Sequence, residues 1–188
     1  MTTRFDVLRK LRSTDNKRVL MAIEDLRVRG WLFDGSLANM AFCHAQMQHA
    51  DLLGANLANV DLHQADLENA DLSQANLAGA RLSRANLRRA DFSQAIIANA
   101  DFFKADLQNA RNLTDEQLLQ AKRLWGALMP DGTTYDGRYN LAGDIEFAIW
   151  GRIDVNDPRA MAEFLQIPLE TYLRGQELGA NLTMKEPA

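Results

Sequence analysis

Cysteine and long apolar runs are what this chain has least of. Its single cysteine, Cys43, excludes an internal disulfide and is typical of a protein kept in a reducing compartment. No apolar run approaches the ~18 residues that a membrane-spanning helix needs, and the first ten residues, MTTRFDVLRK, lack the apolar stretch of a signal peptide. These absences predict a cytoplasmic protein that has no membrane partner.

The chain also has little excess of one charge sign over the other. The 188 residues carry a formal net charge of −4, which is too mild to indicate nucleic acid or a membrane surface as a partner. Hydrophobic residues make up 47% of the chain, an ordinary share for a globular protein. The length suits one solid core, or a solenoid closed by segments at its ends.

What the chain has in abundance is a five-residue repeat. Of the sixteen positions spaced five apart from 35 to 110, thirteen hold alanine, and the exceptions are Gly35, Met40 and Val60. Two residues after each of the first fifteen stands Leu, Phe, Met or Ile. A period of five fits neither the 3.6 residues of a helix nor the 2 of a strand. It predicts a solenoid that turns a corner every five residues and buries one small and one large side chain in each quintet.

The quintets resemble the pentapeptide-repeat family, whose motif is Ala-(Asp/Asn)-Leu followed by two variable residues. Residues 50–52 and 65–67 read Ala-Asp-Leu, and residues 75–77 read Ala-Asn-Leu. The resemblance covers residues 30–111. It implies a mainly β fold, a right-handed, quadrilateral β-helix with four quintets in each coil.

Segments that cover the exposed core are expected at both ends of a solenoid. We predict an N-terminal helical cap over residues 1–30, with an amphipathic helix at 15–29 that ends at Gly30 and a shorter helix at 4–12. Residues 31–111 then form the β-helix, in about four coils. Residues 112–188 form a C-terminal segment of helices and loops.

The C-terminal segment carries helix signals of its own. Thr114 and Gln117 form a capping box, and apolar residues after them predict a helix that runs through Trp125 and ends at Gly126. Residues 133–143 read as a polar loop. Two further helices are predicted, from Asp157-Pro158 and from Pro168 to about Leu178. Their rhythm resembles a helix-turn-helix, but the second carries only one basic residue, so it predicts packing rather than DNA binding.

Four quintets per coil place residues twenty apart directly above one another, roughly 4.8 Å apart. Asp51, Asp71 and Asp91 form one such column, which either attracts a cation or simply hydrogen-bonds the local backbone at the corners. In a second column Arg81 lies between two aspartates, and Glu68 lies under Arg88. These residues predict surface ion pairs worth a few tenths of a kcal/mol each.

Cys43, His44 and His63 are the residues that come nearest to forming a reactive site. Cys43 and His63 are twenty apart, so a thiol and two imidazoles approach one another as an incomplete metal site or a nucleophile with its base. A third orienting group is missing from the pattern, and a flat face offers no pocket. The sequence therefore predicts no catalytic residue, no metal site and no cofactor.

One face of the predicted coil has almost no charge, and alanines twenty apart form a column along it. Either the C-terminal segment covers this face, or a partner protein binds it, a second copy of the chain included. The candidate interface consists of Ala38, Asn39, Asn56, Ala58, Asn59, Asn76, Ala78, Ala98 and Asn99.

These patterns indicate a non-enzymatic protein-interaction or scaffold module with an unknown protein partner. The alternative is a DNA-mimicking modulator of a type II topoisomerase, because some members of the family protect DNA gyrase from quinolones with a long acidic dimeric rod. Residues 36–110 hold eight acidic and five basic residues, a net charge of −8 + 5 = −3. A phosphate-backbone mimic needs a denser negative surface.

Overall fold

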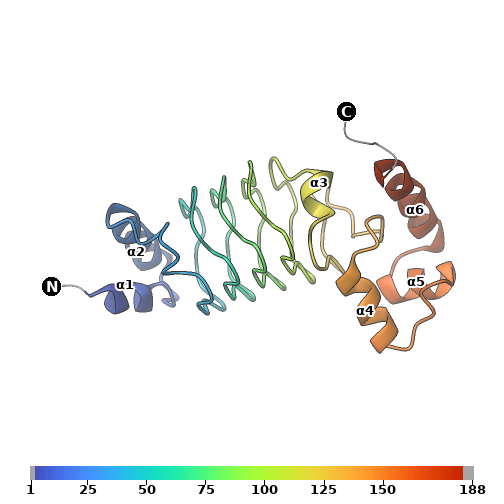
Figure 1. The fold of residues 1–188 in the computed structure, drawn as a ribbon, viewed down its shortest axis with the longest axis horizontal. Helices are drawn as coiled ribbons and strands as arrows, with labels where there is room; N and C mark the ends of the chain where they lie inside the picture. The colour runs from blue at the N-terminus through green and yellow to red at the C-terminus, as the bar shows by residue number, and fades with distance from the viewer. Residues whose placement is uncertain (1–2, 184–188) are drawn as a thin grey trace.

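The computed structural model describes residues 3–183 as helices at the two ends of a coiled shaft (Figure 1). Helices α1 and α2 precede the shaft, and α3 to α6 follow its last complete coil. None of the helices within the described range is long and apolar enough to cross a membrane. The six helices are α1 (Arg4–Lys10), α2 (Asn16–Val28), α3 (Asp115–Leu118), α4 (Ala142–Trp150), α5 (Pro158–Leu165) and α6 (Leu169–Thr183).

The shaft is held together by parallel bridges between residues twenty apart. Asp51 pairs with Asp71, and Asp71 pairs in turn with Asp91. The Leu52 N–H donates to the Asp71 carbonyl oxygen at 2.8 Å, and Leu72 repeats this contact with Asp91 at 2.9 Å. Four quintets therefore complete one turn of the coil, as the resemblance to the pentapeptide-repeat family implies.

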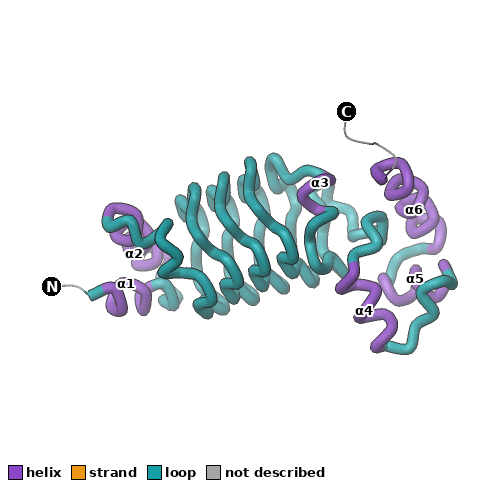
Figure 2. The backbone as a smooth tube through the Cα atoms, in the orientation of Figure 1, coloured by secondary structure: helices purple, strands orange, loops and turns teal. Residues whose placement is uncertain are grey.

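Conventional strands are absent from the described part of the shaft, so the expectation of a mainly β fold is met only in part (Figure 2). Each bridge is one residue long and is followed by a turn, such as the one closed by Ala75 N–H on the Leu72 carbonyl at 3.0 Å. The third residue of each turn is left-handed, with φ between 54° and 61° at every non-glycine position of this kind from 39 to 109. A positive φ at that position is characteristic of a type II turn. It redirects the chain before a second consecutive bridge can form.

The inside of the shaft is a continuous stack of the two repeated apolar positions. Leu62, Leu72 and Leu82 are completely buried, as are the alanines that alternate with them. Phe92 and Phe102 meet edge to face in the last coils, with their ring centroids 6.4 Å apart. The core extends without a break into α1 and α2 through Val7, Val19 and Leu26.

Helix α2 begins and ends close to the predicted residues. The Asp15 side chain accepts from the Lys17 N–H, and Val19 and Leu26 face the core. Gly30 is left-handed with φ +73°, and the Trp31 N–H donates to the Leu26 carbonyl at 2.9 Å. This is the hydrogen-bond pattern of a Schellman ending, in which glycine removes the steric cost of a positive φ.

The predicted helix through Trp125 is wrong. The capping box at Thr114 is present, but α3 covers only four residues, and the chain then returns to the coil. Arg123 pairs with Asp101 and Leu128 pairs with Asp106, so this partial coil is offset by 22 residues instead of 20. Gly126, read as a helix end, is the left-handed turn residue of a further quintet, with φ +70°.

Helix α4 was not predicted, and its first two residues lie in the segment predicted as a loop. Asp144, 4% exposed, attaches α4 to the partial coil by accepting the N–H groups of Leu124 at 3.1 Å and Trp125 at 3.0 Å. The Trp125 indole donates to the Phe164 carbonyl at 2.8 Å and so joins α5 to the same coil. Helix α5 has the predicted Asp-Pro start, and α6 continues five residues beyond the predicted Leu178.

Candidate functional site

The uncharged face, the nine residues of the candidate interface defined above, lies along one side of the shaft. The Asn39 N–H donates to the Ala58 carbonyl at 2.9 Å, and the Asn59 N–H donates to the Ala78 carbonyl at 2.8 Å. These ladder bonds place the alanines in one column, as the twenty-residue spacing predicts. The alanines are half-buried, and the three left-handed asparagines Asn39, Asn59 and Asn99 are exposed.

The half-buried asparagines of this face, Asn56 and Asn76, have a structural role. Asn56 and Asn76 pair with each other across consecutive coils. Each side chain accepts the N–H two residues on, Ala58 at 3.3 Å and Ala78 at 3.1 Å. Such Asx turns fix the corner of a coil. Helices α5 and α6 lie beyond the last coil (Figure 1), whereas the start of α4 approaches this face near Asn99.

Ile96 departs from the Asp/Asn motif on the same side of the shaft. Its side chain is 52% exposed, in a position where the coils below carry Asn56 and Asn76. An exposed isoleucine adds apolar contact area to the uncharged face without adding charge. Ile96 is thus an exposed apolar residue on the side of the shaft that carries the candidate interface.

The aspartate column makes the local hydrogen bonds of its repeat. Asp71 accepts from the Ser73 N–H and Asp91 from the Ser93 N–H, both at 2.9 Å. Hydrogen bonds from Asn112 and Ser93 hold the pKa of Asp91 below its ordinary value, with a smaller contribution from Arg111. This geometry supports the interpretation of the column as corner hydrogen bonding.

The predicted ion pairs are present in part, because Asp101, expected beside Arg81, pairs with Arg123. Arg81 lies 3.5 Å from Asp61. Glu68 pairs with Arg89 at 3.6 Å and not with Arg88, which pairs with Asp106 at 3.0 Å in the coil above. The prediction assumed strictly vertical columns, but a long arginine side chain reaches diagonally to a carboxylate that lies closer.

Cys43 lacks the surroundings of an activated nucleophile. Partial burial raises the pKa of its thiol, and the nearby Asp61 carboxylate raises it further. The rings of His44 and His63 meet edge to face with centroids 6.1 Å apart. Within residues 3–183, no group of three or more His, Cys, Asp or Glu side chains is placed to hold a metal ion.

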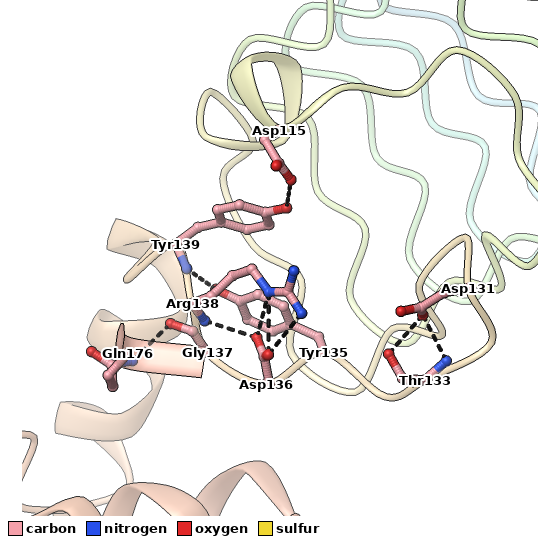
Figure 3. A network of polar contacts seen from close by, with 9 residues as sticks. All are labelled: Asp115, Asp131, Thr133, Tyr135, Asp136, Gly137, Arg138, Tyr139 and Gln176. Atoms are coloured by element: carbon pink, nitrogen blue, oxygen red, sulfur yellow. Dashed lines mark hydrogen bonds and ion pairs between the residues drawn. The ribbon is translucent and has the colours of Figure 1, made fainter. Parts of the chain in front are cut away.

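A buried polar network joins the loop after the partial coil to helices α3 and α6 (Figure 3). The Tyr139 hydroxyl donates to Asp115 at 2.5 Å, and the Tyr139 N–H donates to the Tyr135 hydroxyl at 3.2 Å. Arg138 forms a salt bridge with Asp136 at 2.8 Å. Burial is the main cause that raises the pKa of both tyrosines well above the ordinary value. The phenols therefore stay protonated. The Tyr139 hydroxyl serves as a structural donor and the Tyr135 hydroxyl as a structural acceptor.

Sequence reasoning missed a groove of about 740 Å³ between the last coils and the start of α4. One wall is the column of Arg81, Asp101 and Arg123, and the other includes Ala142, Gly143 and Glu146 of α4. Glycine at 143 allows the close approach, because a Cβ there would lie 2.6 Å from the Lys122 carbonyl oxygen. The groove depends on α4, which no sequence signal identified.

Comparison with known proteins identifies the repeat. The family model "Pentapeptide repeats (8 copies)" matches two overlapping segments, residues 36–74 and 70–109. No curated protein matches the chain.

Three solved structures illustrate the similarity. HetL, a pentapeptide repeat protein involved in heterocyst differentiation regulation from Nostoc sp. strain PCC 7120, is 30% identical over 53% of this chain and 61% of HetL, with a TM-score of 0.21. Another pentapeptide repeat protein from Nostoc is 31% identical over 46% of this chain and 79% of its own, with a TM-score of 0.21. QnrB1, a plasmid-mediated fluoroquinolone resistance protein, is 19% identical over 38% of this chain and 48% of its own, with a TM-score of 0.23.

This chain spans about three fifths of HetL, and the TM-scores are too low to carry a comparison of shape. The assignment rests instead on the unbroken quintets, the two matches to the repeat model and the bridges between residues twenty apart. The chain belongs to the pentapeptide-repeat family.

Proposed function

We propose that this protein is a non-enzymatic interaction module whose uncharged face binds a partner protein in the cytoplasm. The observation that carries the proposal is the side of the shaft on which exposed asparagines and half-buried alanines repeat without a charge. Short side chains lose little conformational entropy on contact. A flat partner surface meets no charge here that it must desolvate.

The size of the uncharged face limits what it binds alone. About four coils at ~4.8 Å and three extended residues at ~3.3 Å give roughly 20 Å by 10 Å, or about 200 Å². A stable interface buries about 800 Å² on each partner. A partner that binds stably must therefore extend onto neighbouring surfaces, and a dimer through this face alone is expected to be weak.

Modulation of DNA gyrase is the second candidate, and it follows from the family rather than from a feature of this surface. The coil from 80 to 99 carries four arginines and one aspartate, which interrupts any continuous acidic surface. DNA presents one negative charge per ~1.7 Å of helix axis. The charge pattern therefore favours the interaction module.

The experiment compares the wild type with the double variant Ala58→Arg/Ala78→Arg in a pull-down from the source cell. Two long cations on the face should abolish capture of the partner, because a bound surface would bury them unpaired. Light scattering on the purified proteins reports whether a homodimer is lost at the same time. Melting temperature should change little, since both positions are already half-exposed.

The matched control is Ser73→Arg/Ser83→Arg, which adds the same charge on other sides of the shaft. We expect the control to retain the partner. Equal capture by both double variants would overturn the proposed role of the uncharged face.

A further inference from the structure

The groove beside α4 borders the uncharged face. Asn99 of that face lines the groove, together with Gly79 from the coil below. Helix α4 rises from the opposite side, and its exposed residues Ala142, Glu146 and Trp150 share one helix face by their spacing. A partner on the uncharged face thus meets the groove next.

The cations of the groove are unequally neutralised. Arg123 is held by Asp101 through two hydrogen bonds, the Arg123 Nε bond being 3.2 Å long. Arg81 is 69% exposed and lies 3.5 Å from Asp61, a distance that leaves its donors accessible. Lys122 is exposed, and within residues 3–183 its ammonium group has no salt-bridge partner. Arg81 and Lys122 therefore offer free donors to one side of the groove.

The start of α4 adds little positive potential to the same space. Asp144 stands in its first turn, and the Gly143 N–H already donates to the Lys122 carbonyl oxygen at 3.0 Å. A carboxylate at a helix N-terminus offsets the partial positive charge there. Attraction for an anion therefore comes from Arg81 and Lys122.

We propose that the groove binds carboxylate side chains of an acidic polypeptide segment, held by Arg81 and Lys122. Glu146, on the α4 wall, accepts N–H groups of the segment's backbone, and the exposed Asn99 amide donates to its carbonyl groups. The proposal rests on the proposed function and deepens it by naming the chemistry of the partner.

The acidic residues of the groove favour a peptide over a nucleic acid as its ligand. Asp101 and Glu146 line the walls, and the chain as a whole has a net charge of −4. A phosphodiester strand brings a charge with every nucleotide and meets these carboxylates along its length. A peptide with isolated Asp or Glu residues places its carboxylates at the cations and its amides elsewhere.

The test is a titration of the ¹⁵N-labelled full chain with the acetylated and amidated pentapeptide Gly-Glu-Ala-Glu-Gly, followed by NMR. We expect saturable shifts of the amide signals of Asn99, Lys122 and Gly143. The same peptide with glutamine in place of glutamate should leave these signals unchanged. Arg81→Gln/Lys122→Gln should weaken binding about tenfold, while signals distant from the groove report that the variant is folded.

The control is Arg84→Gln/Lys17→Gln, which removes the same two charges at exposed positions outside the groove. Glutamine is compatible with the left-handed conformation at position 84, since Gln64, Gln74 and Gln94 occupy equivalent turn positions. Equal weakening by the control, or shifts with the glutamine peptide, would show unspecific attraction and overturn the proposal. Tighter binding of a five-nucleotide oligothymidine at the same amides would also overturn it.

This outcome is separable from that of the pull-down. If the peptide binds the groove while Ala58→Arg/Ala78→Arg still captures the partner, only the role of the uncharged face is refuted. If the double variant loses the partner but the peptide does not bind the wild type, only the proposed role of the groove is refuted.

Discussion

Each position in a quintet has its own structural role. In residues 70–74, Ala70 and Leu72 are completely buried, Asp71 accepts the Ser73 N–H, and Gln74 takes the left-handed turn conformation. A positive φ costs a non-glycine residue roughly 1 kcal/mol or more. The turn bond from the Ala75 N–H to Leu72 and the ladder bond from the Gln74 N–H to Ser93 offset this cost, so polar and basic side chains are accepted there as well as glycine.

Leu72→Asp tests the inward position. A carboxylate in the middle of the stack is removed from water without a partner, so we expect the free energy of unfolding to fall by more than ~3 kcal/mol. Urea unfolding followed by circular dichroism measures the change. Gln74→Asp, two residues on, is exposed and tolerates the left-handed conformation, so it should cost under ~1 kcal/mol. An unchanged midpoint for Leu72→Asp would refute the inward assignment.

At the scale of elements, α4 depends on one buried carboxylate. Asp144 is the acceptor for two N–H groups of the partial coil, and a Cβ at the adjacent position 143 would clash with that coil. Burial raises the pKa of Asp144 from 3.8 to about 6 despite these hydrogen bonds and the opposing effect of Arg123. The Asp144 carboxyl, which attaches α4 to the partial coil, therefore loses its proton as the pH rises through about 6.

The sign of the pH effect is set by the direction of the shift. Because the folded protein holds the Asp144 proton more tightly than the unfolded chain, the contribution to stability is full below pH 3.8 and is lost as the pH rises through about 6. The shift of about two units corresponds to roughly 3 kcal/mol.

Urea unfolding from pH 4 to 7.5 of the wild type and Asp144→Asn measures this contribution. The variant should gain relative to the wild type as the pH rises, by up to about 3 kcal/mol. Asp154→Asn, at an exposed position, serves as the control and should show no such trend. A constant difference between wild type and Asp144→Asn across the range would contradict the assignment.

At the scale of the whole molecule, charge is arranged in bands along the shaft. The coil from 60 to 79 carries four acidic residues, and the next coil carries four arginines. Neighbouring bands meet in pairs such as Arg81 with Asp61 and Arg88 with Asp106. The bands shorten the range of the electrostatic field, because opposite charges a few Å apart cancel at a distance.

We expect no inhibition of DNA gyrase at physiological salt. A DNA mimic needs a continuous negative surface, and the arginine band divides the one on this shaft. A supercoiling assay with the purified protein measures the effect. Inhibition at stoichiometric concentrations would reverse the order of the two proposed functions.

The repeat is the part of this protein that the sequence determined by itself. A position that recurs every five residues follows a local rule, so the inward leucines can be derived from spacing alone. The columns of outward residues also require four quintets in each coil, which the resemblance to the pentapeptide-repeat family implies. The ends of α2 and the start of α5 were also predictable, because Asp15, Gly30 and Asp157 act on the backbone within a few residues.

Only the tertiary structure decided how the chain continues after the last regular coil. Leu118, Ala121 and Trp125 have helical spacing, yet the bridge from Arg123 to Asp101 returns the chain to the coil, because pairing with an existing edge outweighs a weak local preference for helix. The groove likewise joins Arg81 to Glu146, 65 positions further along the chain. Contacts over such separations depend on how whole elements pack, which no local pattern records.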